Sequence, residues 1–310
     1  MSSPSSSVMP VAVLGPTASG KSAVAMAVAR RLGDIDLVSV DAMQVYRGMD
    51  IGTAKPTHDE RAQVPHHLID LVDATADFSV AEFQQHVADV RQRLASTGRR
   101  GLLVGGTGLY HRVVVDGLTL PGQWPDLRAE LEAEATAMGP EVLHERLTGI
   151  DPTAAARMEP TNVRRVVRAL EVCLGSGEPF SSFGPGLDSH PPADVVQIGL
   201  RWDRDVLAAR IERRVRHMVD AGFLDEVRGL TATGMSRTAR QALGYRELLD
   251  HVEGRISLDE AIDTTILRTR QFAVRQLRWF RRDPRVRWVD VVDDPVAEAA
   301  PVVAAALHHP

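Results

Sequence analysis

An eight-residue segment of the chain, Gly15-Pro-Thr-Ala-Ser-Gly-Lys-Ser22, fits the pattern G-x-x-x-x-G-K-[ST] at every fixed position. The apolar residues 11–14 precede it as a buried strand would, and the small residues within 21–32 favour a helix. A strand, a glycine-rich loop and a helix in this order form a phosphate cradle, lined by backbone N–H groups and a helix N-terminus. Lys21 is expected to neutralise the terminal phosphate, and the Ser22 hydroxyl to bind Mg²⁺. The motif leaves open which phosphate compound binds and whether a phosphoryl group is transferred.

Further apolar runs with strand character follow in the first third of the chain. They are residues 37–40, which end at Asp41, residues 67–72, and residues 101–106, which end in glycines. Between the last two runs, residues 78–95 have the spacing of a helix, with Ser79 and Glu82 placed as a capping box. Strands that alternate with helices in this way predict a parallel α/β sheet.

The pattern changes after Leu120. Residues 121–178 have helical spacing throughout, residues 175–192 are rich in Gly, Pro and Ser, and residues 195–200 are again typical of a strand. The remainder, to about residue 280, is mostly helical in pattern. We therefore expect an α/β core with an inserted all-helical lobe. The expected boundaries are 1–120 for the first part of the core, 121–193 for the lobe, and 194–310 for the completion of the core and the basic C-terminal helices.

The composition is that of a soluble globular protein. The 310 residues are 44% apolar and 25% charged, and no apolar run approaches the roughly 18 residues of a membrane helix. The first seven residues lack the basic and hydrophobic regions of a secretion signal. The single cysteine, Cys173, cannot form an internal disulfide or a thiolate metal site, and a small buried side chain explains it. These features predict a cytoplasmic protein with no membrane segment.

The net charge of −5 argues weakly against a nucleic-acid partner, but the distribution of charge matters more than its sum. Only two of the 36 basic residues are lysines, Lys21 and Lys55. The arginines concentrate at Arg164, Arg165 and Arg168, within residues 201–216, and within residues 268–287. A genome-wide bias toward arginine instead of lysine explains the total number of arginines. It explains their clustering less well.

Residues at the expected carboxyl ends of the strands are candidates for chemistry, because α/β proteins place ligands there. Asp41 could bind Mg²⁺ through water, cap a helix or act as a general base. The residue type alone does not distinguish these three roles. Gln44 can pair with the edge of a base, although a lone glutamine is more often a surface residue. Thr107 follows two glycines, at which a close approach of backbone and ligand is expected.

Other polar residues have structural explanations beside the functional ones. Lys55 is either an anion contact or part of a solvated loop. The adjacent His66 and His67 cannot easily face one metal ion, so we do not expect a zinc site. Arg210 and Arg214 share one face of a predicted helix, which is either an anion-binding face or a surface paired with nearby acids.

Eight segments of the chain form a series that is more specific than any one of them. They are GPTASGKS from Gly15, SVDAMQVYRGMDIGTAKP from Ser39, PHHLID from Pro65, SVAEF from Ser79, LLVGGTGLY from Leu102, NVRRVVRALEV from Asn162, QALGYRE from Gln241 and TRQFAVRQLRWF from Thr269. In content and order they resemble the bacterial tRNA dimethylallyltransferases, also called tRNA isopentenyltransferases. The resemblance runs from residue 11 to about residue 290. The glycine-rich loop is shared with many families, whereas DAMQVYRGMDIGTAKP together with GGTGLY is far more specific.

The resemblance implies a P-loop NTPase or kinase-like parallel sheet core with an inserted helical lobe. It implies transfer of a dimethylallyl group from dimethylallyl diphosphate to N6 of the adenosine at tRNA position 37, just 3′ of the anticodon. Diphosphate would be released, and N6-(dimethylallyl)adenosine would form in tRNAs that read codons starting with U. The implied cofactor is Mg²⁺ at Ser22. The implied partner is the anticodon stem-loop of tRNA, and we expect a monomer.

The resemblance also assigns roles to individual residues. Asp41 matches the general base for the N6 amine, and Lys21, Ser22 and Thr107 match the other residues of the catalytic centre. The implied diphosphate-binding residues are Gly15, Pro16, Thr17, Ala18, Ser19, Gly20, Lys21, Ser22 and Arg214. The implied tRNA-binding residues are Asp41, Ala42, Met43, Gln44, Thr107, Arg128, Arg164, Arg165, Arg168, Gln241, Gly244, Tyr245 and Arg246. Ala42 departs from the family, in which serine is frequent, and we expect little effect because its neighbours match.

Two other functions share part of this pattern. A P-loop small-molecule kinase that uses ATP would have the same fold and loop, and composition does not exclude it. A nucleotide-gated RNA-binding switch of the GTPase type needs an N-K-x-D segment for guanine, which the sequence lacks. Release of diphosphate from an allylic diphosphate, dependent on RNA, distinguishes the transferase from the kinase.

Overall fold

The computed structural model describes residues 8–118, 120–183 and 189–308. Its strands are β1 (Val11–Leu14), β2 (Ile35–Val40), β3 (Tyr46–Arg47), β4 (His66–His67), β5 (Val72–Asp73), β6 (Arg100–Gly105), β7 (Val196–Trp202) and β8 (Val286–Val291). Its first helices are α1 (Lys21–Leu32), α2 (His58–Gln63), α3 (Val80–Thr97) and α4 (Gly108–Asp116). They are followed by α5 (Pro125–Met138), α6 (Pro140–Ile150), α7 (Pro152–Ala155), α8 (Val163–Ser176) and the 3₁₀ helix η1 (Phe180–Ser182). The last are α9 (Arg204–Asp220), α10 (Phe223–Thr233), α11 (Arg237–Arg240), α12 (Tyr245–Val252), α13 (Leu258–Phe280) and α14 (Pro295–His308).

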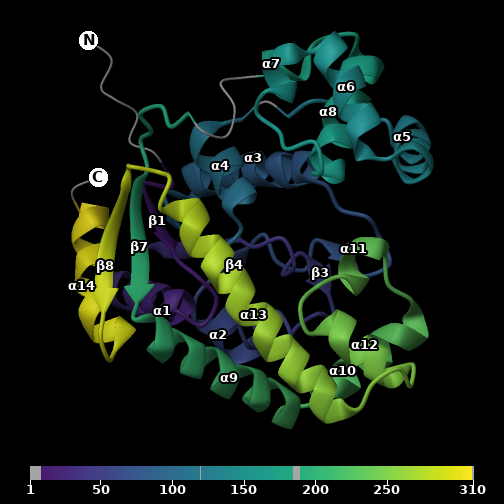
Figure 1. Ribbon diagram of the computed structural model, residues 1–310. Helices are drawn as coiled ribbons and strands as arrows, with labels where there is room; N and C mark the ends of the chain where they lie inside the picture. The colour runs from purple at the N-terminus through teal and green to yellow at the C-terminus, as the bar shows by residue number, and fades with distance from the viewer. Residues whose placement is uncertain (1–7, 119, 184–188, 309–310) are drawn as a thin grey trace, which may run out of the picture. The chain divides into compact units, whose positions relative to one another are not determined.

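A six-stranded parallel sheet in the order β4-β2-β6-β1-β7-β8 forms the centre of the first of two compact units, residues 8–116 with 192–308 (Figure 1). Strand β1 lies between β6 and β7, and alternate residues of β1 enter different hydrophobic clusters. Val11 and Val13 join a cluster with α1 and α14, whereas Ala12 and Leu14 join one with α3 and α4. Because both faces of β1 are covered, it is a continuous apolar run instead of an alternating pattern. The predicted α/β class is confirmed.

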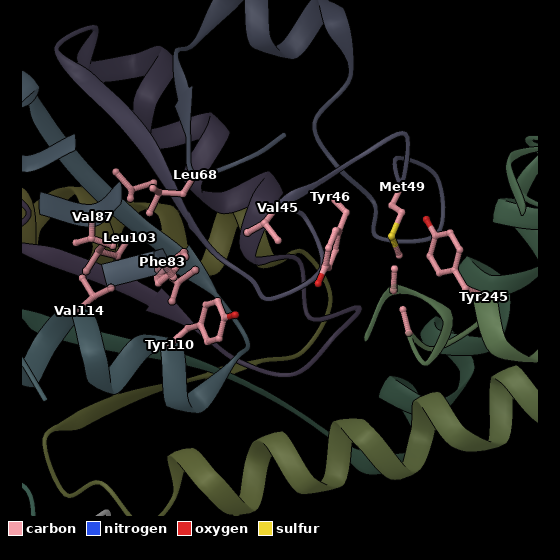
Figure 2. Close-up of a cluster of buried hydrophobic side chains, with 14 of the residues drawn as sticks. Val45, Tyr46, Met49, Leu68, Phe83, Val87, Leu103, Tyr110, Val114 and Tyr245 are labelled. Atoms are coloured by element: carbon pink, nitrogen blue, oxygen red, sulfur yellow. The ribbon is translucent and has the colours of Figure 1, made fainter. Parts of the chain in front are cut away.

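The larger cluster connects the sheet to the loops that follow β2 (Figure 2). Phe83 of α3 and Tyr110 of α4 lie with their ring centroids 4.4 Å apart, beside Leu103 of β6. Val45 and Tyr46 extend the same cluster toward the C-terminal helices, where Tyr245 is buried. This packing fixes the loop after β2, which carries the candidate residues 41–44, against the rest of the unit.

The local sequence patterns located most of these elements correctly. Strands β1, β2, β6 and β7 and helix α1 lie where they were predicted, within a few residues. Helix α3 begins after Ser79, and the capping box of Ser79 and Glu82 is present with both hydrogen bonds. Strand β8 and helix α14 were not predicted. In β8 buried and exposed residues mix, because it is the last strand of the sheet and is partly exposed.

The single strand predicted at residues 67–72 is wrong. The chain pairs with β2 only at His66 and His67, and then bends at Leu68 and Asp70, which have φ values of 63° and 54°. The Asp70 carboxylate accepts hydrogen bonds from Lys55 and Arg61. These ion pairs stabilise a path in which the chain leaves the sheet after His67 and runs beside the loop after β2.

The second compact unit, residues 117–191, is helical in its described part. Helices α5 and α6 both pack on α8, and their core includes Leu131, Leu147 and Leu170. The fully buried carboxylate of Glu171 binds two arginines inside this unit. Among all the described residues, no helix is long and apolar enough to cross a membrane.

The close packing of β6 on β2 leads to a test with two glycines. A Cβ atom at Gly105 would lie 2.1 Å from the backbone oxygen of Val40, so Gly105→Ala must shift β6 or its neighbour β2. We expect the free energy of unfolding to fall by about 1–3 kcal/mol. Gly229, inside α10, has no atom within 4 Å of an added Cβ, and Gly229→Ala should raise it by about 0.5–1 kcal/mol. Urea denaturation measures both, and equal effects of the two substitutions would contradict the packing.

Candidate active site

The candidate residues meet at the carboxyl ends of three neighbouring strands. The glycine-rich loop follows β1, Asp41 follows β2, and Thr107 follows β6. A cavity of about 740 Å³ opens between them. Helices α9 and α13 contribute Arg214 and Gln276 to its wall. The cavity therefore lies where parallel α/β sheets bind their ligands.

The glycine-rich loop has an unusual backbone that other parts of the fold hold in place. Ala18 has a φ of 62° and Gly20 a φ of 90°, and α1 begins directly afterwards at Lys21. The Trp202 indole donates to the backbone oxygen of Ser19 over 2.9 Å. The Arg210 guanidinium lies 4.1 Å from the centre of the Trp202 ring and donates to the backbone oxygen of Ala18. Bonds from β7 and α9 thus stabilise a left-handed alanine that would otherwise be strained.

Two cations lie close together at the loop. Lys21 Nζ donates to the backbone oxygen of Pro16 over 2.7 Å. Burial and then the charge of Arg214 lower the pKa of Lys21 from 10.5 to about 7, although Asp41 opposes the shift. Burial also lowers the pKa of Arg214, again against the effect of Asp41. Within the described residues the Arg214 guanidinium forms no hydrogen bond or ion pair. An anion between these two groups would relieve their repulsion.

Asp41 lines the same cavity. One carboxylate oxygen accepts the backbone N–H of Met43 at 2.8 Å and that of Gln44 at 3.4 Å. The other oxygen, Oδ2, has no hydrogen bond within the described part of the chain. Thr107 Oγ1 accepts the neighbouring N–H of Ala42 at 3.2 Å, which connects the loop after β6 to the loop after β2. Asp41 is therefore held by a turn while one oxygen stays available to a ligand.

Gln44 lines the cavity but also closes its own loop. Its Oε1 accepts from the Ser39 hydroxyl at 2.7 Å, and its Nε2 donates to the backbone oxygens of Thr53 and Ala54 at 3.2 Å. Both amide hydrogens are thus used within the protein. Lys55 is neither solvated nor facing an external anion: its amine is buried and pairs with Asp50 and Asp70.

Comparison with known proteins places this geometry in a family. The IPP transferase model matches residues 44–283, and the isopentenyl transferase model matches residues 9–76. The chain is 50% identical over 281 residues to the tRNA dimethylallyltransferase of Streptomyces coelicolor, covering 90% of this chain and 89% of the relative. It is 47% identical over 291 residues to that of Geobacter metallireducens, covering 90% and 92%. This chain belongs to the IPP transferase family.

Solved structures agree with that assignment. The crystal structure of the tRNA isopentenylpyrophosphate transferase from Bacillus halodurans is 42% identical, with a TM-score of 0.68 and 96% of each chain covered. A eukaryotic dimethylallyltransferase whose structures were determined acting on tRNA shares the fold, with a TM-score of 0.78 at 22% identity over 94% of this chain and 76% of the other. The family resemblance and the fold predicted from the motifs are confirmed.

The arginines of the helical unit of this IPP transferase divide into two groups. Arg128 donates to the buried Glu171 carboxylate over 2.8 and 2.6 Å, and Arg168 pairs with it at 2.9 Å. Their charges are thus compensated inside the unit. Arg164 and Arg165, in the first turn of α8, are exposed. Exposure leaves these two able to meet an external phosphate.

The four residues predicted to bind tRNA in the QALGYRE segment also fall into two groups. Gln241 and Arg246 are exposed, and Gln241 lines the cavity. Gly244 and Tyr245 are buried, and the Tyr245 hydroxyl donates to Glu226 at 2.6 Å. Glu226 was not predicted as a site residue. It also accepts the backbone N–H groups of residues 50–52, and so fixes a loop that lines the cavity.

Ser22 is the position at which the sequence predicts Mg²⁺ to bind, and its surroundings fit such a site. Within the described residues no three His, Cys, Asp or Glu side chains form a group that could hold a metal ion. His66 pairs with the backbone oxygen of Val64, and His67 with Asp36. Mg²⁺ commonly takes only one or two protein oxygens and completes its shell with substrate phosphates and water. The exposed Ser22 lines the cavity, as Asp41 does, and its hydroxyl suits such binding.

The lowered pKa of Lys21 leads to a test of the electrostatics. The unfolded chain holds the Lys21 proton up to pH 10.5 and the folded chain only up to about pH 7. The native protein therefore loses stability as the pH falls through this window, with the full loss present below it. Because Lys21→Met removes that loss, its stability relative to the native protein should be greater at about pH 6.5 than at about pH 9. Urea denaturation at both pH values measures the difference, and a pH-independent difference would refute the buried charge.

Proposed function

We propose that this IPP transferase transfers a dimethylallyl group from dimethylallyl diphosphate to N6 of adenosine 37 in tRNA, just 3′ of the anticodon. One observation carries the proposal beyond the names of the relatives. Lys21, Arg214 and Asp41 line a single cavity and act on one another electrostatically, so sites for an anionic leaving group and for a proton acceptor meet at one reacting centre. The product would be N6-(dimethylallyl)adenosine in tRNAs that read codons starting with U.

Within the cavity the glycine-rich loop, residues 15–22, holds the diphosphate. The N-terminus of α1 and the side chains of Lys21 and Arg214 bring positive charge to the bridging oxygen, where negative charge develops as the C–O bond breaks. The repulsion between the two cations falls when the anion is present. The Ser22 hydroxyl would hold Mg²⁺, and the ion would supply further charge neutralisation when bound.

Asp41 receives the proton of the adenine amine. The N6 lone pair forms a bond to C1 of the allyl group, the C1–O bond breaks, and its electron pair leaves with the diphosphate. The N6 proton passes to the carboxylate, for which Oδ2 is available because Oδ1 is held by the turn. The exocyclic amine is a poor nucleophile, so removal of its proton as the bond forms lowers the barrier. Thr107 keeps the Asp41 loop in place through Ala42.

The tRNA partner follows from the position of the reacting centre. A base stacked in the anticodon loop cannot reach Asp41, so we infer that it is flipped into the cavity. The exposed Arg164 and Arg165 hold phosphates of the anticodon stem-loop, and Gln241 and Arg246 meet the RNA near the cavity. We also propose that the protein acts as a cytoplasmic monomer.

The ATP-dependent kinase has no observation in its favour. A kinase and this enzyme share the glycine-rich loop, but the relatives with the same motifs along nearly the whole chain are named as transferases.

Incubation with dimethylallyl diphosphate, Mg²⁺ and unmodified tRNA carrying A36-A37-A38 tests the proposal. Nucleoside mass spectrometry should find N6-(dimethylallyl)adenosine, and no prenylated adenosine would refute the function. Asp41→Asn keeps an oxygen for the turn and loses the base, so turnover should fall by about 10²–10⁴-fold. Binding of tRNA to the variant, measured by filter retention, should change little. Turnover near the native level would reject Asp41 as the base.

The two exposed arginines of α8 are tested separately. The double variant Arg164→Glu/Arg165→Glu should bind tRNA at least about tenfold more weakly, with a salt dependence smaller by roughly one to two ions. Arg30 and Arg31, at the opposite end of α1 from the glycine-rich loop, form a matched exposed pair. The variant Arg30→Glu/Arg31→Glu makes the same change in net charge and should leave the salt slope unaltered. Equal effects of both double variants would mean that only total charge matters.

A further inference from the structure

We infer that Gln276 of α13 is a positioning residue, which sets the distance between the diphosphate loop and the loop that carries Thr107. The inference rests on the proposed function and names a residue outside the motif positions to which roles were assigned. Gln276 is 7% exposed and lines the cavity. Its Oε1 accepts the backbone N–H of Thr17 at 2.9 Å, and its Nε2 donates to the backbone oxygen of Gly106 at 2.9 Å. One amide group thus bridges the two loops.

The two loops follow adjacent strands of the sheet, so the distance between them can vary only a little. Leu14 at the end of β1 is paired with Gly105 at the end of β6. A Cβ atom at Gly106 would lie 2.4 Å from Gln276 Nε2 and 3.2 Å from the backbone oxygen of Gly15. The absence of a side chain at Gly106 is what lets the amide reach between the loops. A change in the length or contacts of residue 276 must therefore move one loop relative to the other.

The bridge requires a side chain that carries both a donor and an acceptor at its end. Thr17 N–H needs an acceptor, and the carbonyl of Gly106 needs a donor, and both lie at the end of one side chain. Glutamate offers acceptors only when it is ionised, lysine and arginine offer donors only, and methionine offers neither. Since the cavity wall is buried, an unmatched N–H or C=O group costs more than the bond itself contributes.

The bridge also connects to the reacting groups. Next to Gly106, Thr107 accepts the N–H of Ala42, which adjoins Asp41. On the other side, Thr17 belongs to the loop that ends at Lys21. Gln276 is thus connected through neighbouring residues both to the proton acceptor, Asp41, and to the loop that binds the leaving group. In a displacement at carbon these two sites must hold the reacting atoms in line, and an error of about 1 Å can reduce the rate 10²-fold.

The first experiment separates positioning from binding and from stability. Gln276→Met keeps the side-chain length and loses both hydrogen bonds. We expect kcat for tRNA prenylation to fall about 10–100-fold, while KM for dimethylallyl diphosphate and the Kd of inorganic diphosphate with Mg²⁺ change less than about threefold. Gln92→Met on the exposed face of α3 is the matched control and should leave all three values unchanged.

The results can distinguish a failure of this inference from a failure of the proposed function. A native kcat in Gln276→Met overturns the inference, and so does a loss of rate that is matched by an equal rise in KM and Kd. A native protein that forms no prenylated adenosine would instead refute the proposed function. In that case the bridge would still be tested by whether Gln276→Met changes the protection of the Thr17 amide from hydrogen exchange, with unchanged protection counting against it.

A second variant covers the case in which Gln276→Met does not fold. Gln276→Glu has the same shape, and its protonated form can again donate to Gly106 and accept from Thr17. We therefore expect the ratio of kcat for Gln276→Glu to native kcat to rise at least about threefold between pH 8 and pH 6. A side chain that only fills the core would give a ratio independent of pH, and that result would overturn the inference.

Discussion

The backbone of the glycine-rich loop can bind an anion only if its own polar groups are held in the right directions, and three distant side chains do this. Trp202 bonds the carbonyl of Ser19, Arg210 that of Ala18, and Gln276 accepts the N–H of Thr17. The loop includes a left-handed alanine, which has a cost in isolation. Its shape is therefore a property of the whole α/β unit and not of the eight residues that form the motif.

The charged side chains beside the glycine-rich loop also depend on residues from other parts of the α/β unit. Lys21 and Arg214 are buried near each other, with Asp41 as the nearby carboxylate that offsets their repulsion. Below about pH 7, where Lys21 keeps its proton, the folded chain thus carries an unfavourable pair of cations before any ligand arrives. Under the proposed function, a diphosphate would remove part of this repulsion when it binds, so the site would convert folding free energy into affinity for its anion. The arginines of the helical unit show the opposite solution, because Glu171 compensates Arg128 and Arg168 from within.

The sequence predicted what depends on neighbours along the chain. The strand, loop and helix around residues 11–32 and the capping box of Ser79 and Glu82 are local patterns, and they were confirmed. The strand at residues 67–72 was wrong because ion pairs from Lys55 and Arg61 to Asp70 decided the backbone, and no periodicity records them.

In the candidate site, too, residues in local patterns were predicted and residues with distant partners were missed. The motifs located the loop after β1, Asp41 and Thr107, since each lies next to glycines or at the end of an apolar run. Glu226 and Gln276 were missed because their partners are backbone atoms far away in the sequence. Such a bond leaves no pattern of side-chain types. Only the path of the folded chain shows which backbone groups a given glutamate or glutamine can reach.

The order of the strands has a consequence for how the protein is made. Strand β1 lies between β6 and β7, and the whole helical unit is translated before β7. Helices α5 to α8 contact one another over short sequence distances, so this unit can fold while the sheet is still incomplete. Trp202, Arg210 and Gln276 leave the ribosome later still. During synthesis the phosphate motif therefore precedes all three of the side chains that hold its loop in shape.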